Sequence, residues 1–379
     1  MDREIYLDNS STTCVCPQAA EKVLTMMTQC YGNPSSLHHK GNEALRELSS
    51  AREQIARVLH ASPEEILFTS GGTEANNLAV FGAAKAGQKR GRHIVTTAFE
   101  HSSVLACMQQ LEKEGWSVTY IKPDRQGHIT AEQVEEAITP DTVLVSIMAV
   151  NNEIGTLPPL QAVPAAIRRQ KAPALFHVDA VQAFGKMPLN PGRMGIDLLT
   201  CSSHKIHGPK GAGALYHRRG VHILPRQFGG EQENRLRPGT EAVPALCGFG
   251  AAAAALPPLA DWHRKMEELN TLARRELAAI DGVILHSPED ALPCILHISA
   301  GHVRAQTMLN YLSQRGIFVS SGSACAKGAR SHVLVAMGLP QKEIDSSLRI
   351  SFSYQNTPDD IHALCAALQS GLRDLIARP

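Results

Sequence analysis

Three residues of different chemical types are candidates for catalysis: a lysine, an aspartate and a cysteine. Lys205 lies in CSSHKIHGPKGAGALY, Asp179 ends an apolar run before it, and Cys325 lies later in SSGSACAKGARS. An amine that is partly removed from water at a strand end can form a covalent bond with an aldehyde cofactor. A thiolate can take up a group that leaves the substrate. The combination indicates carbonyl-cofactor chemistry that transfers an atom to sulfur.

The position of Asp179 narrows the choice of cofactor. It follows the run 174–178, which predicts a buried strand. Pyridoxal 5'-phosphate (PLP) needs such a carboxylate to keep its ring nitrogen protonated, so that the ring can act as an electron sink. On its own, a strand-end aspartate is more often a cap or turn residue, and Lys205 a solvated lysine in a polar turn. Ser202 and His204 add hydrogen-bond donors beside the lysine and favour PLP.

A glycine-rich turn before a helix provides a candidate phosphate site. Residues 70–73 (Ser-Gly-Gly-Thr) follow a predicted strand at 65–69 and precede a predicted helix at 74–86. The N–H groups and the dipole at a helix N-terminus favour an anion, and Thr73 adds a hydroxyl. A plain N-cap gives the same pattern, so the local sequence leaves both interpretations open. The nucleotide-binding motifs GxxxxGK[ST] and GxGxxG are both incomplete in this chain.

Nine short motifs follow one another along nearly the whole chain. They are YLDNSSTT (6–13), YGNPSSLH (31–38), TSGGTEANN (69–77), EH (100–101), NNEIGT (151–156), HVDAVQ (177–182), SSHKIHGPKG (202–211), RPGTE (237–241) and SSGSAC (320–325). In this order they resemble the cysteine desulfurases of the class V aminotransferase group of PLP enzymes. Ser10 and Ser203 depart from the pattern, which commonly has alanine and glycine there; both changes are small.

The resemblance implies a role for each matching residue. Lys205 would hold the cofactor and remove the substrate Cα proton, and His101 would stack on the cofactor ring and shuttle protons near its ordinary pKa. The residues implied to bind the cofactor are Gly72, Thr73, His101, Asn152, Asp179, Gln182, Ser202, His204, Lys205 and, from the neighbouring subunit, Thr240. Asn152 and Arg349 would hold the substrate carboxylate, for which a guanidinium offers two parallel hydrogen bonds. The chain would therefore act as a homodimer.

Cys325 decides which reaction the resemblance implies. Small residues surround it, and Lys327 and Arg330 would favour its thiolate. A cysteine desulfurase would convert L-cysteine to L-alanine and leave a persulfide on Cys325 for an acceptor protein, such as an iron–sulfur scaffold or a tRNA-thiolation enzyme. Each of these residues could instead have no catalytic role. Cys325 could be a small buried cysteine, His101 a structural histidine, and Arg349 a surface residue on an edge strand.

Two other functions stay open at this point. A selenocysteine lyase or another class V PLP enzyme would not require Cys325. A catalytically silent scaffold or binding protein could keep the same fold, although the intact Lys205, Asp179 and His101 argue against silence.

The pattern of the chain predicts elements that would position these residues. Its 379 residues exceed the usual size of one core, so we expect a large domain over 14–258 and a small one over 1–13 and 259–379 that carries the Cys325 loop. We expect an α/β fold with a mostly parallel mixed sheet covered by helices, which the resemblance identifies as PLP transferase fold type I, plus a smaller α+β domain. Besides 65–69, the predicted strands are 93–97, 142–148, 174–178, 196–201, 213–217, 295–298, 316–319 and 348–352. The other predicted helices are 41–60, 260–280 and one that begins at Pro358.

Composition excludes several classes of partner. With 37 basic and 36 acidic residues the net charge is +1, so we expect neither nucleic acid nor an anionic membrane as partner. The start MDREIYLDNS lacks a signal-peptide pattern, no apolar stretch is long enough to span a membrane, and we expect a cytoplasmic enzyme. Nine cysteines in this context predict free thiols. Cys201 and His204 are only half of a metal site, so no metal is expected.

Overall fold

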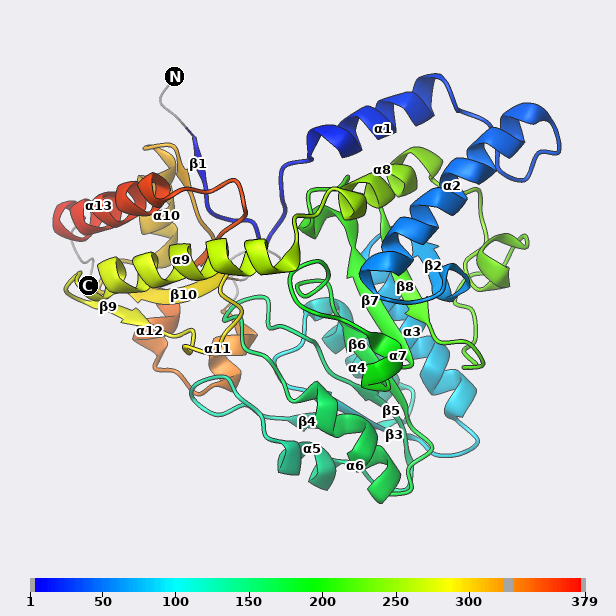
Figure 1. The fold of residues 1–379 in the computed structure, drawn as a ribbon. Helices are drawn as coiled ribbons and strands as arrows, with labels where there is room; N and C mark the ends of the chain where they lie inside the picture. Colours follow the sequence, from blue (N-terminus) through cyan, green and yellow to red (C-terminus); the bar gives the residue numbers. More distant parts are fainter. Residues whose placement is uncertain (1–3, 323–329, 376–379) are drawn as a thin grey trace.

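The computed structural model describes residues 4–322 and 330–375, and it confirms the predicted α/β architecture (Figure 1). The larger part is built on a seven-stranded sheet in the order β2-β8-β7-β6-β5-β3-β4. All neighbours are parallel except at β8, which is antiparallel to both β2 and β7. The strands are β2 (Ile66–Thr69), β3 (His93–Thr97), β4 (Ser117–Ile121), β5 (Thr142–Ser146), β6 (Leu175–Asp179), β7 (Leu198–Ser202) and β8 (Gly213–His217).

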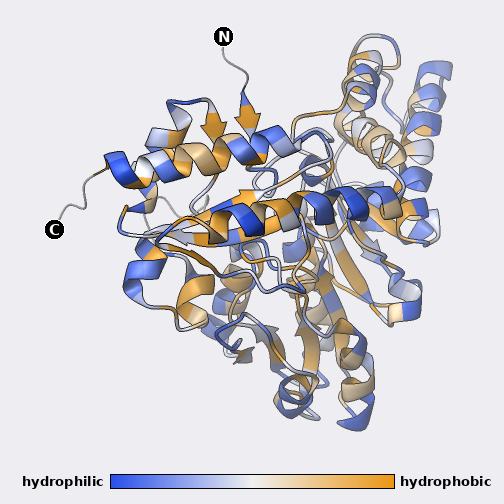
Figure 2. Cartoon of the chain, turned by 60° about the vertical axis from the view of Figure 1, so that its left-hand side comes forward, coloured by the Kyte–Doolittle hydropathy of each residue, from blue (hydrophilic) through white to orange (hydrophobic). Residues whose placement is uncertain are grey.

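Both faces of this sheet are buried, which explains why its central strands are continuous apolar runs. Leu144 and its neighbour Val145 point to opposite faces and belong to different hydrophobic clusters. The Leu144 cluster includes residues of α3 (Gly72–Gly87) and α4 (Ser102–Lys113). The Val145 cluster includes residues of α1 (Pro17–Thr28), α2 (His39–Val58) and α8 (Val243–Ala254). Figure 2 shows hydrophobic residues concentrated in the strands and mixed with hydrophilic residues along the surface helices.

The smaller part contains a three-stranded antiparallel sheet in the order β12-β10-β9. A separate parallel pair joins β1 near the N-terminus to β11. Helix α9 packs on α13 and β9, whereas α8 packs on α1 and α2. The division of the chain at residues 13 and 258 stays a prediction. The elements are β1 (Ile5–Tyr6), α9 (Leu259–Ala278), β9 (Val283–Leu285), β10 (Ile295–Ala300), α10 (Ala305–Ser313), β11 (Ile317–Phe318), α11 (His332–Ala336), α12 (Gln341–Asp345), β12 (Ser347–Ser351) and α13 (Pro358–Asp374).

Some element boundaries differ from the sequence predictions. Helix α3 begins at Gly72 rather than at residue 74, because Gly71, with φ 155°, serves as its N-cap. The strand predicted over 142–148 ends at Ser146, although Ile147 still bonds to the neighbouring strand. Edge strand β4 was not predicted. The remaining helices are α5 (Ala131–Ala137), α6 (Val163–Arg169), α7 (Pro191–Met194) and 3-10 turns at Pro63–Glu65, Leu160–Ala162, Ser203–Lys205 and Gln232–Arg235.

Across the described ranges 4–322 and 330–375, no single helix combines the length and apolar composition needed to cross a membrane. Helices α8 and α9 meet those criteria only when taken together, and they are bent by 80°.

Candidate active site

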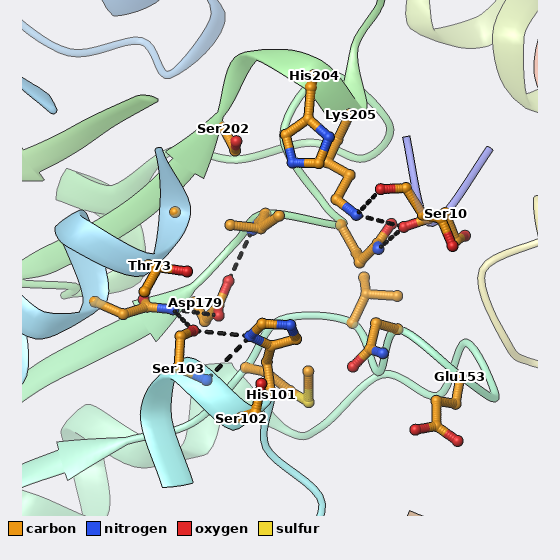
Figure 3. A pocket seen from close by; sticks show the side chains of 18 of the residues that line it. Ser10, Thr73, His101, Ser102, Ser103, Glu153, Asp179, Ser202, His204 and Lys205 are labelled. Carbon is orange, nitrogen blue, oxygen red and sulfur yellow. Dashed lines mark hydrogen bonds between the residues drawn. The ribbon is translucent and has the colours of Figure 1, made fainter. Parts of the chain in front are cut away.

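One cavity of about 360 Å³ lies where the carboxyl ends of the central strands meet the smaller part of the molecule (Figure 3). Polar side chains from β6, β7 and the segments after β3 and β5 line it, and β12 contributes from the other side. In open parallel sheets this edge is the usual place for ligands. The cavity brings together ten of the predicted residues: Gly72, Thr73, His101, Asn152, Asp179, Gln182, Ser202, His204, Lys205 and Arg349.

Lys205 reaches the cavity from the 3-10 turn that follows β7. Its Nζ donates to the carbonyl oxygens of Ser10 and, over 2.7 Å, of Ser11. Both carbonyls belong to the segment after β1, so residues far apart in sequence fix the amine. Beside it, burial and then the positive charges of Lys205 and Lys210 lower the pKa of His204 to about 4. His204 is therefore neutral at neutral pH and can act as a hydrogen-bond donor.

Asp179 ends β6 at the floor of the cavity and is only 5% exposed. Its Oδ1 accepts the backbone N–H of Val181 over 3.0 Å, and its Oδ2 accepts Asn76 Nδ2 over 2.7 Å. Both oxygens therefore have N–H partners, and each retains further acceptor capacity. This arrangement fits a carboxylate that faces a protonated ring nitrogen.

The end of the cavity near α3 fits a phosphate. Ser202 is 1% exposed, yet its hydroxyl has no hydrogen-bond partner among the described residues. A buried polar group without a partner is costly unless a ligand satisfies it. Thr73 lies at the N-terminus of α3, which favours an anion. A Cβ on Gly72 would lie 2.8 Å from a methyl group of Val181, so glycine is required for this close approach. The residues present thus fit the phosphate of PLP.

Arg349 closes the opposite end of the cavity. It lies on the edge strand β12 but is only 2% exposed, so it does not decorate the surface. Its Nη2 donates to Asp8 Oδ1 over 2.9 Å and to Ser11 Oγ over 2.6 Å, and its Nη1 donates to the carbonyl of Asn152 over 2.8 Å. The Asn152 Oδ1 atom is buried without a partner among the described residues. The guanidinium of Arg349 and the amide nitrogen of Asn152 are hydrogen-bond donors, as a substrate carboxylate requires.

His101 is the N-cap of α4, and its side chain lines the same cavity. Its Nδ1 accepts the backbone N–H of Ser103 over 3.2 Å and lies 2.8 Å from Ser103 Oγ. Burial lowers the pKa of His101; the charge of Asp179 opposes this shift, and that of Lys205 adds to it. His101 is therefore biased toward its neutral form.

One predicted residue, Thr240, does not line this cavity. Thr240 is exposed and lines a different surface hollow, formed with residues 226–239. This position agrees with a contact made to another subunit, which stays a prediction. Cys325 lies outside the described residues. Gly322 and His332, on either side of the segment that contains it, both line the cavity.

Several cavity residues were not predicted as functional, although some lie within the quoted motifs. Asn76 and Ser103 bond to Asp179 and His101, respectively. Asn76 follows Gly72 by one helical turn, so helical spacing from the phosphate turn would have indicated it. Glu153 is 1% exposed and accepts Ser331 Oγ over 2.5 Å, and burial raises the pKa of its carboxyl. His332 Nε2 donates to the Glu100 carbonyl over 2.8 Å.

The fold and the site together indicate an enzyme of the PLP-dependent class, and comparison with known proteins agrees with this class. The profile of the aminotransferase class-V family matches residues 5–364, so the chain belongs to that family. Cysteine desulfurase IscS of Clostridium botulinum is 40% identical over 368 residues, which cover 95% of this chain and 92% of that protein. Cysteine desulfurase 2 of Trichormus variabilis is 44% identical over 361 residues, which cover 94% and 90%.

The chain is also similar to solved structures over nearly its whole length. A NifS-like protein superposes with a TM-score of 0.93 and 37% identity, covering 98% of this chain and all of that one. SspA, solved in complex with cysteine, gives a TM-score of 0.82 and 34% identity over 94% of this chain and 100% of its own. These likenesses confirm the predicted PLP fold type I.

Proposed function

We propose that this protein is a cysteine desulfurase, which takes the sulfur of L-cysteine, releases L-alanine and keeps the sulfur as a persulfide on Cys325. The observation that carries this proposal is a cavity lined by Lys205, Asp179 and Arg349 together with a Ser202 hydroxyl that has no partner among the described residues. Relatives named cysteine desulfurase, and the SspA structure that holds cysteine, support the choice of substrate.

The cavity residues divide the binding of PLP among them. When bound, PLP supplies an aldehyde for covalent attachment and a ring that withdraws electrons. We assign the phosphate to Ser202, Thr73 and His204, with the N-terminus of α3 at Gly72 behind it. Asp179 would hold the ring nitrogen in its protonated form. Gln182 Nε2, which donates to the Ser10 carbonyl over 2.9 Å, would supply a hydrogen bond to the phenolic oxygen.

Other residues of the same cavity would bind the substrate and remove its proton. Arg349 and Asn152 would hold the L-cysteine carboxylate, because their groups face the cavity and can pair with two oxygens. Lys205 would remove the Cα proton, since its amine lies at the base of the cavity and is held in place by backbone carbonyls. His101 lines the same cavity as Lys205 and Arg349.

Cys325 would take the sulfur. Its thiolate would attack the substrate sulfur, so that an S–S bond forms while the C–S bond breaks. The electron pair of the C–S bond passes to the carbon skeleton, which gains a proton and leaves as alanine. The support for this role is that both flanks of the segment, Gly322 and His332, lie at the cavity wall.

We further propose a homodimer that places Thr240 at the partner's phosphate end. Thr240 does not line the cavity of its own chain, and the surface around it carries Phe228, which is 87% exposed. Burial of such a side chain favours association. Sedimentation velocity over a dilution series tests this. A fully active monomer would contradict it.

The proposed reaction is tested by incubating the PLP-loaded protein with L-cysteine and a thiol reductant. Alanine and sulfide should appear in equal amounts, and mass spectrometry should place the persulfide on Cys325 when the reductant is omitted. The Cys325→Ala variant should bind L-cysteine yet release almost no alanine. If it releases alanine as fast as the wild type, a lyase reaction replaces the desulfurase. Incubation of the persulfidated protein with candidate acceptors, such as an iron–sulfur scaffold, would identify the sulfur recipient.

A further inference from the structure

A line of buried hydrogen bonds connects the carboxylate of Asp179 to the imidazole of His101. Asn76 Nδ2 donates to Asp179 Oδ2 over 2.7 Å and to Ser103 Oγ over 2.8 Å. Ser103 Oγ then lies 2.8 Å from His101 Nδ1 (Figure 3). Asn76 is 1% and Ser103 7% exposed, so water competes little with these bonds.

The donors in this line fix where each proton lies. The two amide protons of Asn76 are used by Asp179 and Ser103, since a carboxylate oxygen can only accept. Ser103 Oγ already accepts from Asn76, which leaves its hydroxyl proton for His101 Nδ1. The backbone N–H of Ser103 also points at Nδ1. Because Nδ1 faces two donors, it carries no proton, and the neutral ring is protonated at Nε2.

The direction of the line cannot be reversed by turning the Asn76 amide. A flipped amide would place its carbonyl oxygen against Asp179 Oδ2, and two acceptors would then face each other. In the observed orientation it is the Asn76 Oδ1 that lacks a partner among the described residues, which is the lesser cost. The carboxylate that serves the cofactor ring thus also orients the histidine.

We propose that Asn76 and Ser103 are positioning residues that hold His101 neutral with its proton on Nε2, so that His101 donates a hydrogen bond within the cavity and does not act as a base. This departs from the proton shuttling that the resemblance implies, and it leaves Lys205 as the base. The catalytic role of this His101 tautomer rests on the proposed desulfurase function. The tautomer itself follows from the geometry alone.

The surroundings of His101 agree with a neutral ring. The charged and titratable groups that act on it are Asp179 on β6, Lys205 after β7, His332 on α11 and Arg349 on β12. Only Asp179 favours the imidazolium, and its Oδ2 is already engaged by Asn76. The position at the N-terminus of α4 also disfavours a positive charge. A hydrogen-bond donor at Nε2 could stabilise negative charge that develops on the substrate.

The inference is tested by nitrogen NMR of the full-length protein labelled with ¹⁵N-histidine, with and without PLP. His101→Gln identifies the His101 signals by their loss. In the wild type we expect one protonated and one unprotonated ring nitrogen, Nε2 and Nδ1, from about pH 7 upward, because burial lowers the pKa of His101 from the ordinary value of about 6.5. A His101 that is imidazolium at pH 7, or protonated at Nδ1 alone, would overturn the inference.

Two variants make the test specific. Ser103→Ala removes the hydroxyl donor and should raise the pKa of His101 by about half to one pH unit, with Ser103→Thr restoring it. Asn76→Asp should raise it further, since a new carboxylate would draw away the Ser103 proton. Ser102→Ala, at the exposed neighbouring serine, is the control and should leave the pKa unchanged. Equal shifts in Ser102→Ala and Ser103→Ala would contradict the proposal.

A pH profile connects the tautomer to catalysis. Above pH 7 the wild-type kcat/KM for L-cysteine should show no ionisation of His101, because burial lowers the pKa of His101. In Ser103→Ala the acid-side fall that protonation of His101 causes should move to higher pH. A wild-type profile that follows His101 ionisation above pH 7 would contradict the donor role. If the protein turned over no L-cysteine but the NMR result held, the proposed function would fail while the tautomer assignment stood.

Discussion

The two ends of the cavity are built on different principles. At the phosphate end, Ser202 has a buried hydroxyl without a partner among the described residues, and the side chains of Thr73 and His204 there carry no charge at neutral pH. At the carboxylate end, Arg349 is equally buried but already pairs with Asp8, Ser11 and the Asn152 carbonyl. One end offers unused hydrogen bonds, and the other offers bonds that a ligand must displace.

This difference matches what each end is proposed to hold. PLP stays bound through many turnovers, so its phosphate gains from donors that have no competing partner. Substrate and product must come and go, and a carboxylate that competes with Asp8 for Arg349 gains only the difference between two ion pairs. The cavity is therefore expected to bind PLP tightly and L-cysteine weakly.

The largest effect is expected at Lys205, which serves both ends of this arrangement. Lys205→Ala should lower turnover of L-cysteine by about 10³-fold or more, because covalent attachment and proton removal are lost together. Borohydride should attach the cofactor to Lys205, as mapped by mass spectrometry. Lys210→Ala, at an exposed lysine outside the cavity, should keep both properties. Label on Lys210 or Lys186 would refute the assignment.

Variants at the carboxylate end should move substrate binding in opposite directions. Arg349→Lys loses paired hydrogen bonds and should raise KM for L-cysteine by about 10- to 100-fold. Asp8→Asn removes the competing charge and should lower KM by about threefold, since a partly exposed ion pair contributes less than ~1 kcal/mol. Neither change should alter PLP affinity much. A higher KM in Asp8→Asn would show that the ion pair supports the site instead of competing for it.

Glu100, next to His101 in the sequence, is fully buried but does not line the cavity. Its Oε1 accepts Thr97 Oγ1 and the Met148 N–H, but its Oε2 is buried without a partner among the described residues. Burial raises the pKa of Glu100 to about 8, so the folded protein keeps a proton that the unfolded chain releases above its pKa of about 4.3.

It follows that the protonated Glu100 stabilises the fold fully at low pH, and that this contribution is lost as pH rises from about 4.3 toward 8. The loss is at most about 1.4 kcal/mol per pH unit. Urea unfolding between pH 5 and 8 should show this slope as the difference between wild type and Glu100→Gln. Glu268→Gln, on the surface of α9, is the control and should not remove it. Parallel curves for wild type and Glu100→Gln would disprove a protonated Glu100.

The sequence predicts the buried centre of the fold well and its margins poorly. Strands β3 and β8 were predicted residue for residue, because strands buried on both faces are continuous apolar runs. Strand β4 was missed, since Ser117 is exposed and the next three residues are only half-buried at the sheet edge. Strands β1 and β9 were also missed, because two and three residues are too few for a periodic pattern. The equally short β11 lies within the strand predicted over 316–319.

The same contrast holds for the site. Residues within motifs that open a helix or end a strand, such as Thr73 and Asp179, were predicted and lie in the cavity. The ion pair of Arg349 with Asp8 joins residues from opposite ends of the chain, and only the folded backbone brings them together. The bond from Asn76 to Asp179 likewise depends on how α3 packs on β6. Sequence patterns indicate which residues matter, whereas pairing across the fold requires the structure.

The most direct test of the contrast between the two ends is a comparison of PLP with pyridoxal, which lacks the phosphate. Titration calorimetry would measure both ligands on the cofactor-free wild type and on Ser202→Ala. We predict that Ser202→Ala weakens PLP binding by about tenfold (~1.4 kcal/mol) and leaves pyridoxal binding unchanged. It should not lower the melting temperature of the cofactor-free protein, because the hydroxyl has no partner among the described residues. An equal loss for pyridoxal, or unaltered PLP binding, would contradict the assignment of this end to the phosphate.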